Sequence, residues 1–451
     1  MQKYEISDLK NFESKYKKLT NELKKKLKYF NQFLFRFNYD NPAYFHALNG
    51  AGLIYIKKIL KQKNSFFSSF IVILKDFLYT LRYSEIKLLN YKKITNKKII
   101  FTWAYRNNFK VNGSLEDRYL NINSRKLKDI HWIVFFLDQR LPAKIDNNII
   151  LIQTNNKKKF KIYLLLKILA SNLKYLFFDY YYFLFSISSH NYLSHKVSKI
   201  LKKILKKPIN TFLFIYEAQP FQNHIIQHLN KNKIKTLGYI HCPPLSIPTN
   251  LIKKKYSPSK IFVNGVDQKK CLTKLGWKKE EIKVIPSTRF LKIKKNFTNQ
   301  IFLPTSIKSS DKILKNLEFL IINEKLNLNK FKIKNHPSSL NSKENNALIN
   351  EINKLKQKYS NTFKNNSNFK NYSIFLGTSG AIIEALERGC KVIQITEIPI
   401  LDFYSKYFWS SIKSKKINEN IFTYSLIKKG NLIKLGKKPK NLDFFFNSKI
   451  Y

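Results

Sequence analysis

The sequence predicts an α/β protein of two Rossmann-like domains that face each other across a cleft, with a helical extension at the N-terminus. Short apolar runs rich in β-branched and aromatic residues alternate with helical patterns from about residue 96 onward. The alternation falls into two series, which meet in a lysine-rich stretch at 290–296. The chain has 451 residues, of which 44% are hydrophobic, and this suits two or three domains with buried cores.

The first 95 residues mix charged and apolar residues at helical spacing, and they predict mainly helices without a recognisable function. The first α/β series then spans 96–289 and predicts an acceptor-side domain. Its expected strands lie at 98–104, 131–137, 148–154, 211–217, 235–241 and 260–265, with a long helical region up to about 206 and helices at 221–230 and before 275. This alternation predicts a parallel sheet with helices on both faces.

The second series spans 290–435 and predicts the donor domain. Its expected strands lie at 299–306, 331–337, 372–380 and 391–396, and its expected helices at 310–327, 343–359 and 381–388. Gly389 follows the last of these helices, in the position where glycine commonly ends a helix. Residues 436–451 then form a predicted C-terminal tail.

The formal net charge of +56 raises the question of a nucleic-acid partner. Only eight of the 84 basic residues are arginine, the residue that base readout favours, and the lysines are spread along the whole chain. Lys, Asn, Ile, Phe and Tyr are all encoded by AT-rich codons, so genomic base composition explains much of this charge. We therefore predict no specific nucleic-acid partner, but a surface that attracts phosphate donors and an anionic membrane surface.

The cysteines and the apolar segments indicate the cellular location of the protein. Three cysteines without a CxxC pair indicate neither a disulfide framework nor a zinc site. The first thirty residues contain no apolar signal region. The apolar segments 66–74 and 175–188 are shorter than the roughly 20 residues that a membrane span needs. The sequence thus predicts a cytoplasmic protein, with a peripheral position on the inner face of the cytoplasmic membrane as the alternative.

Polar residues gather at the carboxyl ends of the predicted strands, where ligands of open parallel sheets bind. The sharpest case is Gly377-Thr378-Ser379-Gly380, which separates a strand from a helix. Its hydroxyl groups and the free N–H groups of the first helical turn can bind a phosphate, and Glu384 can accept from ribose hydroxyls. The alternative is that Thr378 or Ser379 only caps the helix while Glu384 is solvated.

Four more residues join this expected donor site. His336 ends the preceding strand, and Pro337 fixes the turn after it, so the imidazole can donate to a nucleotide phosphate. The alternative is an ordinary turn at the end of a strand. Thr305 follows the first strand of the donor domain, and Arg289 lies where the two domains meet.

Glu217 and His241 end two strands of the first series, and either can serve as the general base that activates an acceptor hydroxyl. The alternatives are that Glu217 caps the following helix and that His241 is a turn residue. Gln219 lies on the same acceptor side. His224 and His228 have a spacing that can bind metal, but no further ligand accompanies them, so we predict no metal.

Several of these motifs resemble GT-B-type glycosyltransferases of bacterial surface and capsular polysaccharide synthesis. On the donor side the resemblance lies in VIPSTRF (284–290), KIKNHP (332–337) and FLGTSGAIIEALERGCKVIQI (375–395). On the acceptor side it lies in YEAQPFQNHIIQHL (216–229) and GYIHCPPL (238–245), the latter also similar to an element of CDP-glycerol glycerophosphotransferases. Pro286 stands where the family usually has glycine.

The resemblance implies a metal-independent transfer, without a cofactor, of a nonulosonate or Kdo-like sugar from a CMP donor to a glycan or lipid-linked glycan. His336, Thr378 and Ser379 would bind the phosphate. Glu217 or His241 would be the base, with Glu217 favoured because its segment is the closer match. A UDP-sugar 2-epimerase of the same fold is an alternative. A further alternative is a non-catalytic protein that binds polyanions or membrane surfaces.

Overall fold

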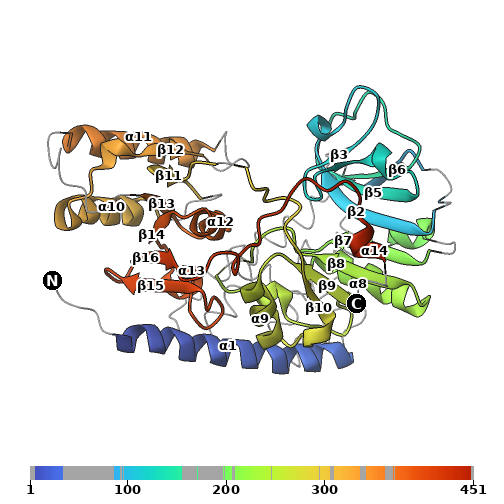
Figure 1. The fold of residues 1–451 in the computed structure, drawn as a ribbon, viewed down its shortest axis with the longest axis horizontal. Coiled ribbons are helices and arrows are strands. Elements are labelled where there is room, and N and C mark those ends of the chain that lie inside the picture. Colours follow the sequence, from blue (N-terminus) through green and yellow to red (C-terminus); the bar gives the residue numbers. More distant parts are fainter. Residues whose placement is uncertain are drawn as a thin grey trace.

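The computed structural model describes residues 6–33, 86–91, 94, 96–154, 170, 197, 199–205, 209–244, 246–293, 295–304, 309–335, 342–360, 369 and 371–447. Within these residues the chain forms two Rossmann-like α/β domains, and a long N-terminal helix lies along both of them (Figure 1). The predicted fold class is therefore confirmed. The expected helical region before about residue 206 and the apolar segments 66–74 and 175–188 lie largely or wholly outside the described residues.

The sheet of the first domain has eight strands in the order β1-β6-β5-β2-β7-β8-β9-β10. They are β1 (Ile86–Leu89), β2 (Lys98–Ala104), β5 (Ile130–Phe136), β6 (Ile149–Thr154), β7 (Thr211–Ile215), β8 (Lys235–Tyr239), β9 (Lys260–Val263) and β10 (Ile282–Val284). All but β1 are parallel; β1 pairs antiparallel with β6, a strand that the sequence analysis did not expect among the mainly helical residues before 95. The chain runs outward from β2 to β6 and returns to β7, so the strand order reverses between β2 and β7, where such sheets bind ligands.

The connections of this sheet differ in kind. Helices α8 (Pro220–Lys231) and α9 (Val266–Lys274) follow β7 and β9. Between β2 and β5 the chain instead forms η1 (Arg106–Asn108), a hairpin of β3 (Glu116–Asp117) and β4 (Ile122–Asn123), and η2 (Ser124–Lys126). Short turns η4 (Thr249–Leu251) and η5 (Lys279–Glu281) precede β9 and β10.

The sheet of the second domain has six strands in the order β12-β11-β13-β14-β16-β15. Four are parallel: β11 (Gln300–Phe302), β12 (Lys332–Lys334), β13 (Tyr372–Leu376) and β14 (Lys391–Ile395). The sequence analysis missed the antiparallel hairpin of β15 (Ile412–Lys416) and β16 (Ile421–Leu426) at one edge. The helical elements are α10 (Ser310–Glu324), η6 (Leu328–Lys330), α11 (Lys343–Lys358), α12 (Ala381–Glu387) and α13 (Pro399–Asp402).

Helix α1 (Ile6–Phe33) contacts both domains and is about 42 Å long at the usual rise per residue. On the second domain, the Tyr16 hydroxyl donates to the Phe403 carbonyl at 3.3 Å, and the Phe12 and Phe403 rings lie 5.3 Å apart. On the first domain, a Cβ placed on Gly276 would lie 3.8 Å from Cε of Lys24. The predicted helical extension thus packs against the α/β core.

The C-terminal segment returns from the second domain to the first. Phe445, in α14 (Asp443–Phe446), is fully buried, and its ring lies 5.2 Å from that of Tyr239 and 4.8 Å from that of Phe262. The described part of the stretch predicted as a tail is therefore packed on the first sheet.

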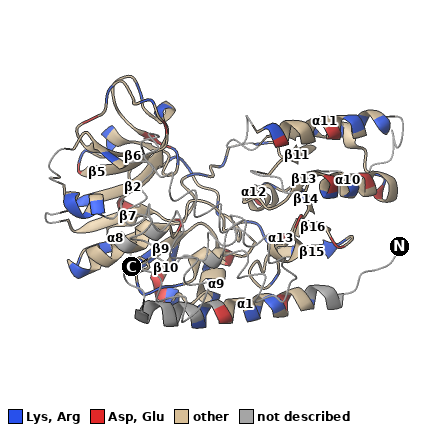
Figure 2. Cartoon of the chain, turned by 180° about the vertical axis from the view of Figure 1, so that it is seen from behind, with Lys and Arg blue, Asp and Glu red and all other residues tan. Residues whose placement is uncertain are grey.

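Charge is distributed over both domains, with Lys and Arg on helices of each (Figure 2). The cores consist of the apolar strand bodies and the inner faces of the helices. Within the described ranges, no helix is both long and apolar enough to cross a bilayer.

Candidate active site

Glu217 and His241 meet at the carboxyl edge of the first sheet, after β7 and β8. Oε1 of Glu217 lies 3.7 Å from Nε2 of His241. The Glu217 side chain is 41% exposed, whereas that of His241 is 4% exposed. Nε2 of Gln219 donates to the other Glu217 oxygen at 3.1 Å, so the three residues predicted for the acceptor side form one group.

The turn that carries Glu217 is fixed by a buried glutamine. Oε1 of Gln222, in the first turn of α8, accepts from the backbone N–H groups of Glu217 and Gln219 at 3.2 and 3.0 Å. Its Nε2 donates to the Ile215 carbonyl at 2.7 Å. Glu217 does not cap α8, because the N-cap of this helix is Gln219.

The pKa values of the two groups shift in opposite directions. Burial lowers the pKa of His241 well below its ordinary value, and the nearby charges of Arg289 and Arg118 lower it further. Surrounding protein raises the pKa of Glu217 by desolvation, although Gln219, Arg289 and Arg118 counteract this. Nδ1 of His241 has no hydrogen-bond partner among the described residues. A neutral imidazole beside a carboxyl group of raised pKa is suited to proton transfer.

Arg289 belongs to this acceptor-side group in the structure, although the sequence analysis assigned it to the donor side. Its guanidinium donates to the Sγ atom of Cys242, the residue after His241. Burial is the main reason that the pKa of Cys242 rises to about 11. The thiol is therefore protonated near neutral pH and is a poor nucleophile.

The sequence analysis missed two residues of the site, Arg118 and Tyr119. The Tyr119 ring is buried and meets the His241 ring edge-on, with centroids 4.4 Å apart. The Arg118 guanidinium lies 4.9 Å from the centre of the Tyr119 ring, and that of Arg289 lies 5.8 Å from it. Both arginines thus flank the ring that contacts His241. The scarcity of arginine in this chain was the one available signal.

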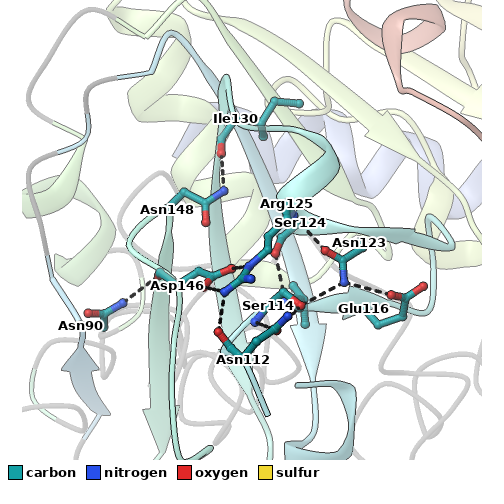
Figure 3. A network of polar contacts seen from close by, with 11 residues as sticks. Asn90, Asn112, Ser114, Glu116, Asn123, Ser124, Arg125, Ile130, Asp146 and Asn148 are labelled. Carbon is teal, nitrogen blue, oxygen red and sulfur yellow. Dashed lines mark hydrogen bonds and ion pairs between the residues drawn. The ribbon is translucent and has the colours of Figure 1, made fainter. Parts of the chain in front are cut away.

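The hairpin that carries Arg118 and Tyr119 is held by a polar network (Figure 3). Nε and Nη2 of Arg125 each donate to one carboxylate oxygen of Asp146 at 2.8 Å. The amide of Asn123 donates to Oγ of Ser114 at 3.0 Å and to Oε2 of Glu116 at 3.1 Å. Bidentate and multiple contacts of this kind fix the geometry of the hairpin.

Asp117 fixes the two site residues themselves. Its buried carboxylate accepts from the backbone N–H groups of Tyr119 and Leu120 at 2.9 and 2.6 Å. It also accepts from the Thr102 hydroxyl on β2. The backbone that presents Arg118 is therefore tied to the central strand of the sheet.

The loop Gly377–Gly380 follows β13, next to the point where the strand order of the second sheet reverses. The Gly377 carbonyl accepts from Nε2 of Gln394 at 2.9 Å, and Gly377 has a φ of +75°, which favours glycine. The Thr378 hydroxyl donates to Asp402. The backbone of this loop is thus held in one arrangement, and the Thr378 hydroxyl hydrogen is already engaged.

Ser379 directly precedes Gly380, the N-cap of the short helix α12. Its Oγ accepts from the backbone N–H of Ala381 at 3.2 Å, and its carbonyl accepts from the Tyr404 hydroxyl at 2.9 Å. Because the Ser379 hydroxyl is the acceptor in its bond with Ala381, its own hydrogen can still be donated to a ligand. Phosphate binding by this loop stays a prediction.

The loops of the two domains touch each other. A Cβ placed on Gly380 would lie 3.3 Å from the carbonyl oxygen of Pro243, two residues after His241. Close by in the chain, Oγ of Ser246 donates to the Leu401 carbonyl of the second domain at 2.6 Å. The acceptor-side group and the predicted donor loop therefore adjoin.

Glu384 has an environment that the sequence analysis did not expect. It is 6% exposed and forms ion pairs with Arg388 at 2.8 Å and Lys295 at 3.3 Å. Arg388 also donates to the carbonyls of Leu291 and Ile293 in the interdomain connection. Glu384 thus stabilises this connection rather than being solvated, and its contact with a ribose stays a prediction.

Three predicted donor residues, Thr305, His336 and Pro337, lie outside the described residues. The strands that precede them, β11 and β12, are neighbours in the sheet, and β11 also pairs with β13. In the described parts of the chain, no three His, Cys, Asp or Glu side chains gather as metal ligands would.

Comparison with known proteins finds similarity to solved structures alone. No protein-family model and no curated protein sequence matches the chain. The UDP-GlcNAc 2-epimerase of Neisseria meningitidis, solved with UDP-GlcNAc, is similar over 66% of this chain and 83% of its own, with 12% identity and a TM-score of 0.35. The S. aureus protein MnaA, solved with UDP, is similar over 66% of this chain and 78% of its own, with 13% identity and a TM-score of 0.32.

Proposed function

We propose that this protein is a nucleotide-sugar-dependent glycosyltransferase that transfers a sugar to a surface-glycan or lipid-linked glycan acceptor. One observation carries the proposal: an accessible carboxyl group of raised pKa lies 3.7 Å from a buried neutral imidazole, at the edge that adjoins the Gly377–Gly380 loop. A proton-transfer pair on one domain and a loop suited to phosphate on the other are what such a transfer needs, and this arrangement supports the proposal.

Glu217 is the base in this proposal, because its side chain is accessible to a substrate while that of His241 is buried. The acceptor hydroxyl gives its proton to Glu217 as its oxygen bonds to the anomeric carbon of the donor sugar. The bond from that carbon to the phosphate oxygen breaks, and the nucleotide leaves with the electron pair. His241 is a positioning residue, which lies beside the Glu217 carboxylate and limits the space around it.

A 2-epimerase of nucleotide sugars is the second candidate. The specific observation that favours it is the pairing of two groups with opposed pKa shifts within 4 Å, which can remove and return a proton at one carbon. Incubation of UDP-GlcNAc alone in heavy water separates the candidates. Deuterium at C2 of the sugar supports epimerisation, and its absence combined with sugar transfer to an added acceptor supports the transferase.

The nucleotide preference tests the donor side. CMP is the expected ligand, and thermal melting with CMP, CDP, UDP and GDP measures it. A ligand at 100 times its dissociation constant stabilises the folded state by about 2.7 kcal/mol, which a melting curve resolves. Stabilisation by none of the four nucleotides would contradict a nucleotide-sugar enzyme of either kind.

Substitution of the base tests the acceptor side. We expect Glu217→Gln to reduce turnover of the nucleotide sugar by about 10²–10⁴-fold while nucleotide binding persists. Glu351→Gln is the matched control, because Glu351 pairs with the exposed Lys354 on the surface of α11. Near-normal turnover of the Glu217→Gln protein would show that another group is the base, and His241→Ala then tests the alternative.

A further inference from the structure

We propose that Arg118 and Arg289 together bind an anionic group of the acceptor, a phosphate or a carboxylate. The inference rests on the proposed function, which it extends by naming the chemical class of the acceptor. Neither residue was assigned this role from the sequence: Arg118 was not singled out, and Arg289 was placed on the donor side.

Neither guanidinium group has a carboxylate partner in the part of the chain that the structure describes. No salt bridge between described residues includes Arg118 or Arg289, whereas Arg125 and Arg388 pair with carboxylates at 2.8 Å. Glu217 is close enough to interact electrostatically with both, but it contacts neither. The site therefore holds two permanent positive charges against one carboxyl group whose ionisation is disfavoured.

Most hydrogen-bond donors of these arginines remain available. Nη2 of Arg118 donates to the Tyr119 hydroxyl at 2.7 Å, and Nη1 of Arg289 donates to Cys242. Each guanidinium has five N–H groups in a planar fork that matches the oxygens of a phosphate or carboxylate. Because both lie against the Tyr119 ring, which is itself packed on His241, their positions are restricted before any ligand binds.

The surroundings of Arg118 indicate an acceptor rather than the donor. Arg118 also lies 4.9 Å from the ring of Tyr105, and Tyr105 lines a shallow hollow of about 460 Å³. The other lining residues are Arg106, Asn107 and Asp138, at the carboxyl ends of β2 and β5. All four lining residues belong to the first domain, and Tyr105 links the hollow to Arg118, so an anion beside Arg118 lies on the acceptor side.

Anion binding by purified full-length protein tests the proposal. Inorganic phosphate and pyrophosphate serve as probes of a phosphate site, and malonate serves as the probe of a carboxylate site. Each is titrated calorimetrically at constant ionic strength set with chloride. We expect the wild-type chain to bind at least one of these anions, and Arg118→Gln and Arg289→Gln each to raise its dissociation constant about tenfold to a hundredfold.

Lys413→Gln is the control for the loss of one positive charge, because Lys413 is exposed on the edge strand β15. The control should bind the anion as the wild type does. Arg118 is an exposed side chain, so the Arg118→Gln protein should have the same melting temperature as the wild type. If Arg289→Gln does not fold, the anion affinity of Arg118→Gln alone tests the proposal. Equal affinity in all variants, or no binding of any probe by the wild type, overturns the proposal.

Competition separates the acceptor from the donor. The titration is repeated with the chain saturated by the nucleotide that stabilises it most. Unchanged anion affinity supports an acceptor site, and loss of anion binding would assign the arginines to the donor phosphate and overturn the proposal. Because the titrations need no turnover, their failure is distinguishable from a failure of the proposed function. The arginines can prove not to bind an anion while Glu217→Gln still abolishes transfer, and they can bind one while Glu217→Gln leaves transfer unchanged.

Discussion

Glu387, the last residue of α12, holds the segment that crosses from the second domain back to the first. It is 1% exposed, and its carboxylate accepts three backbone N–H groups, from Gly430 at 2.7 Å, Leu432 at 2.7 Å and Ile433 at 3.1 Å. Glu387→Gln replaces one of the two oxygens by an NH₂ group that faces a backbone donor. One charge-assisted hydrogen bond is lost and one buried donor is left unpaired, which together cost about 2–4 kcal/mol.

Urea unfolding measures this loss as a lower midpoint at unchanged slope. Glu351→Gln again serves as the control, because its ion pair with Lys354 has side chains 45% and 70% exposed and should contribute at most about 0.5 kcal/mol. A Glu387→Gln protein within about 0.5 kcal/mol of the wild type would refute the reasoning. It would mean that the crossing segment is held by its apolar contacts and that the three hydrogen bonds contribute little.

Two further predictions concern backbone space and pH. A Cβ on Gly265 would lie 2.1 Å from the Leu432 carbonyl oxygen, whereas one on Gly389 would meet nothing within 4 Å, although Gly389 has a φ of +90°. Gly265→Ala should therefore lower the melting temperature far more than Gly389→Ala, which costs only about 1–2 kcal/mol of backbone strain; equal losses would contradict this. Because the folded state lowers the pKa of His241, the unfolded chain binds a proton below about pH 6.5 that the folded chain does not. Stability should fall as the pH drops from 6.5 toward the lowered pKa, and His241→Asn should reduce this fall in urea titrations between about pH 5 and 8; an unchanged pH dependence would refute it.

The sequence predicted the buried strands well because their bodies are continuous apolar runs. β5 and β7 are buried along their whole length, and such runs are typical of the interior of a parallel sheet. The missed strands are edge strands with a different pattern. β15 reads IKSKK, with exposed lysines alternating along it, and β1 has only four residues. A charged edge strand is identified by its pairing partner, which the local sequence does not show.

The candidate site was predictable only in part, for a related reason. Glu217 and His241 follow apolar strands, so the rule that ligands lie at strand ends placed them together. Arg118 and Tyr119 come from a hairpin that replaces the usual crossover helix, and their position depends on Asp117 and on contacts distant in sequence. The pair of Glu384 with Arg388 has the i,i+4 spacing of a helix and could have been expected from the sequence. Its pair with Lys295 depends on the interdomain connection, and neither this pair nor the position of Arg118 and Tyr119 has a local pattern.

In the proposed function, the two arginines would link acceptor binding physically to proton transfer. Their charges lower the pKa of both Glu217 and His241 in the free protein. An anion bound between them would offset these charges, so the pKa of each group would rise. Glu217 would then be a stronger base at the moment when the acceptor hydroxyl is in place, and a weaker one when the acceptor site is empty. A protein that activates its base only beside a bound acceptor would also limit the loss of donor sugar to water, because water carries no anionic group to neutralise the pair.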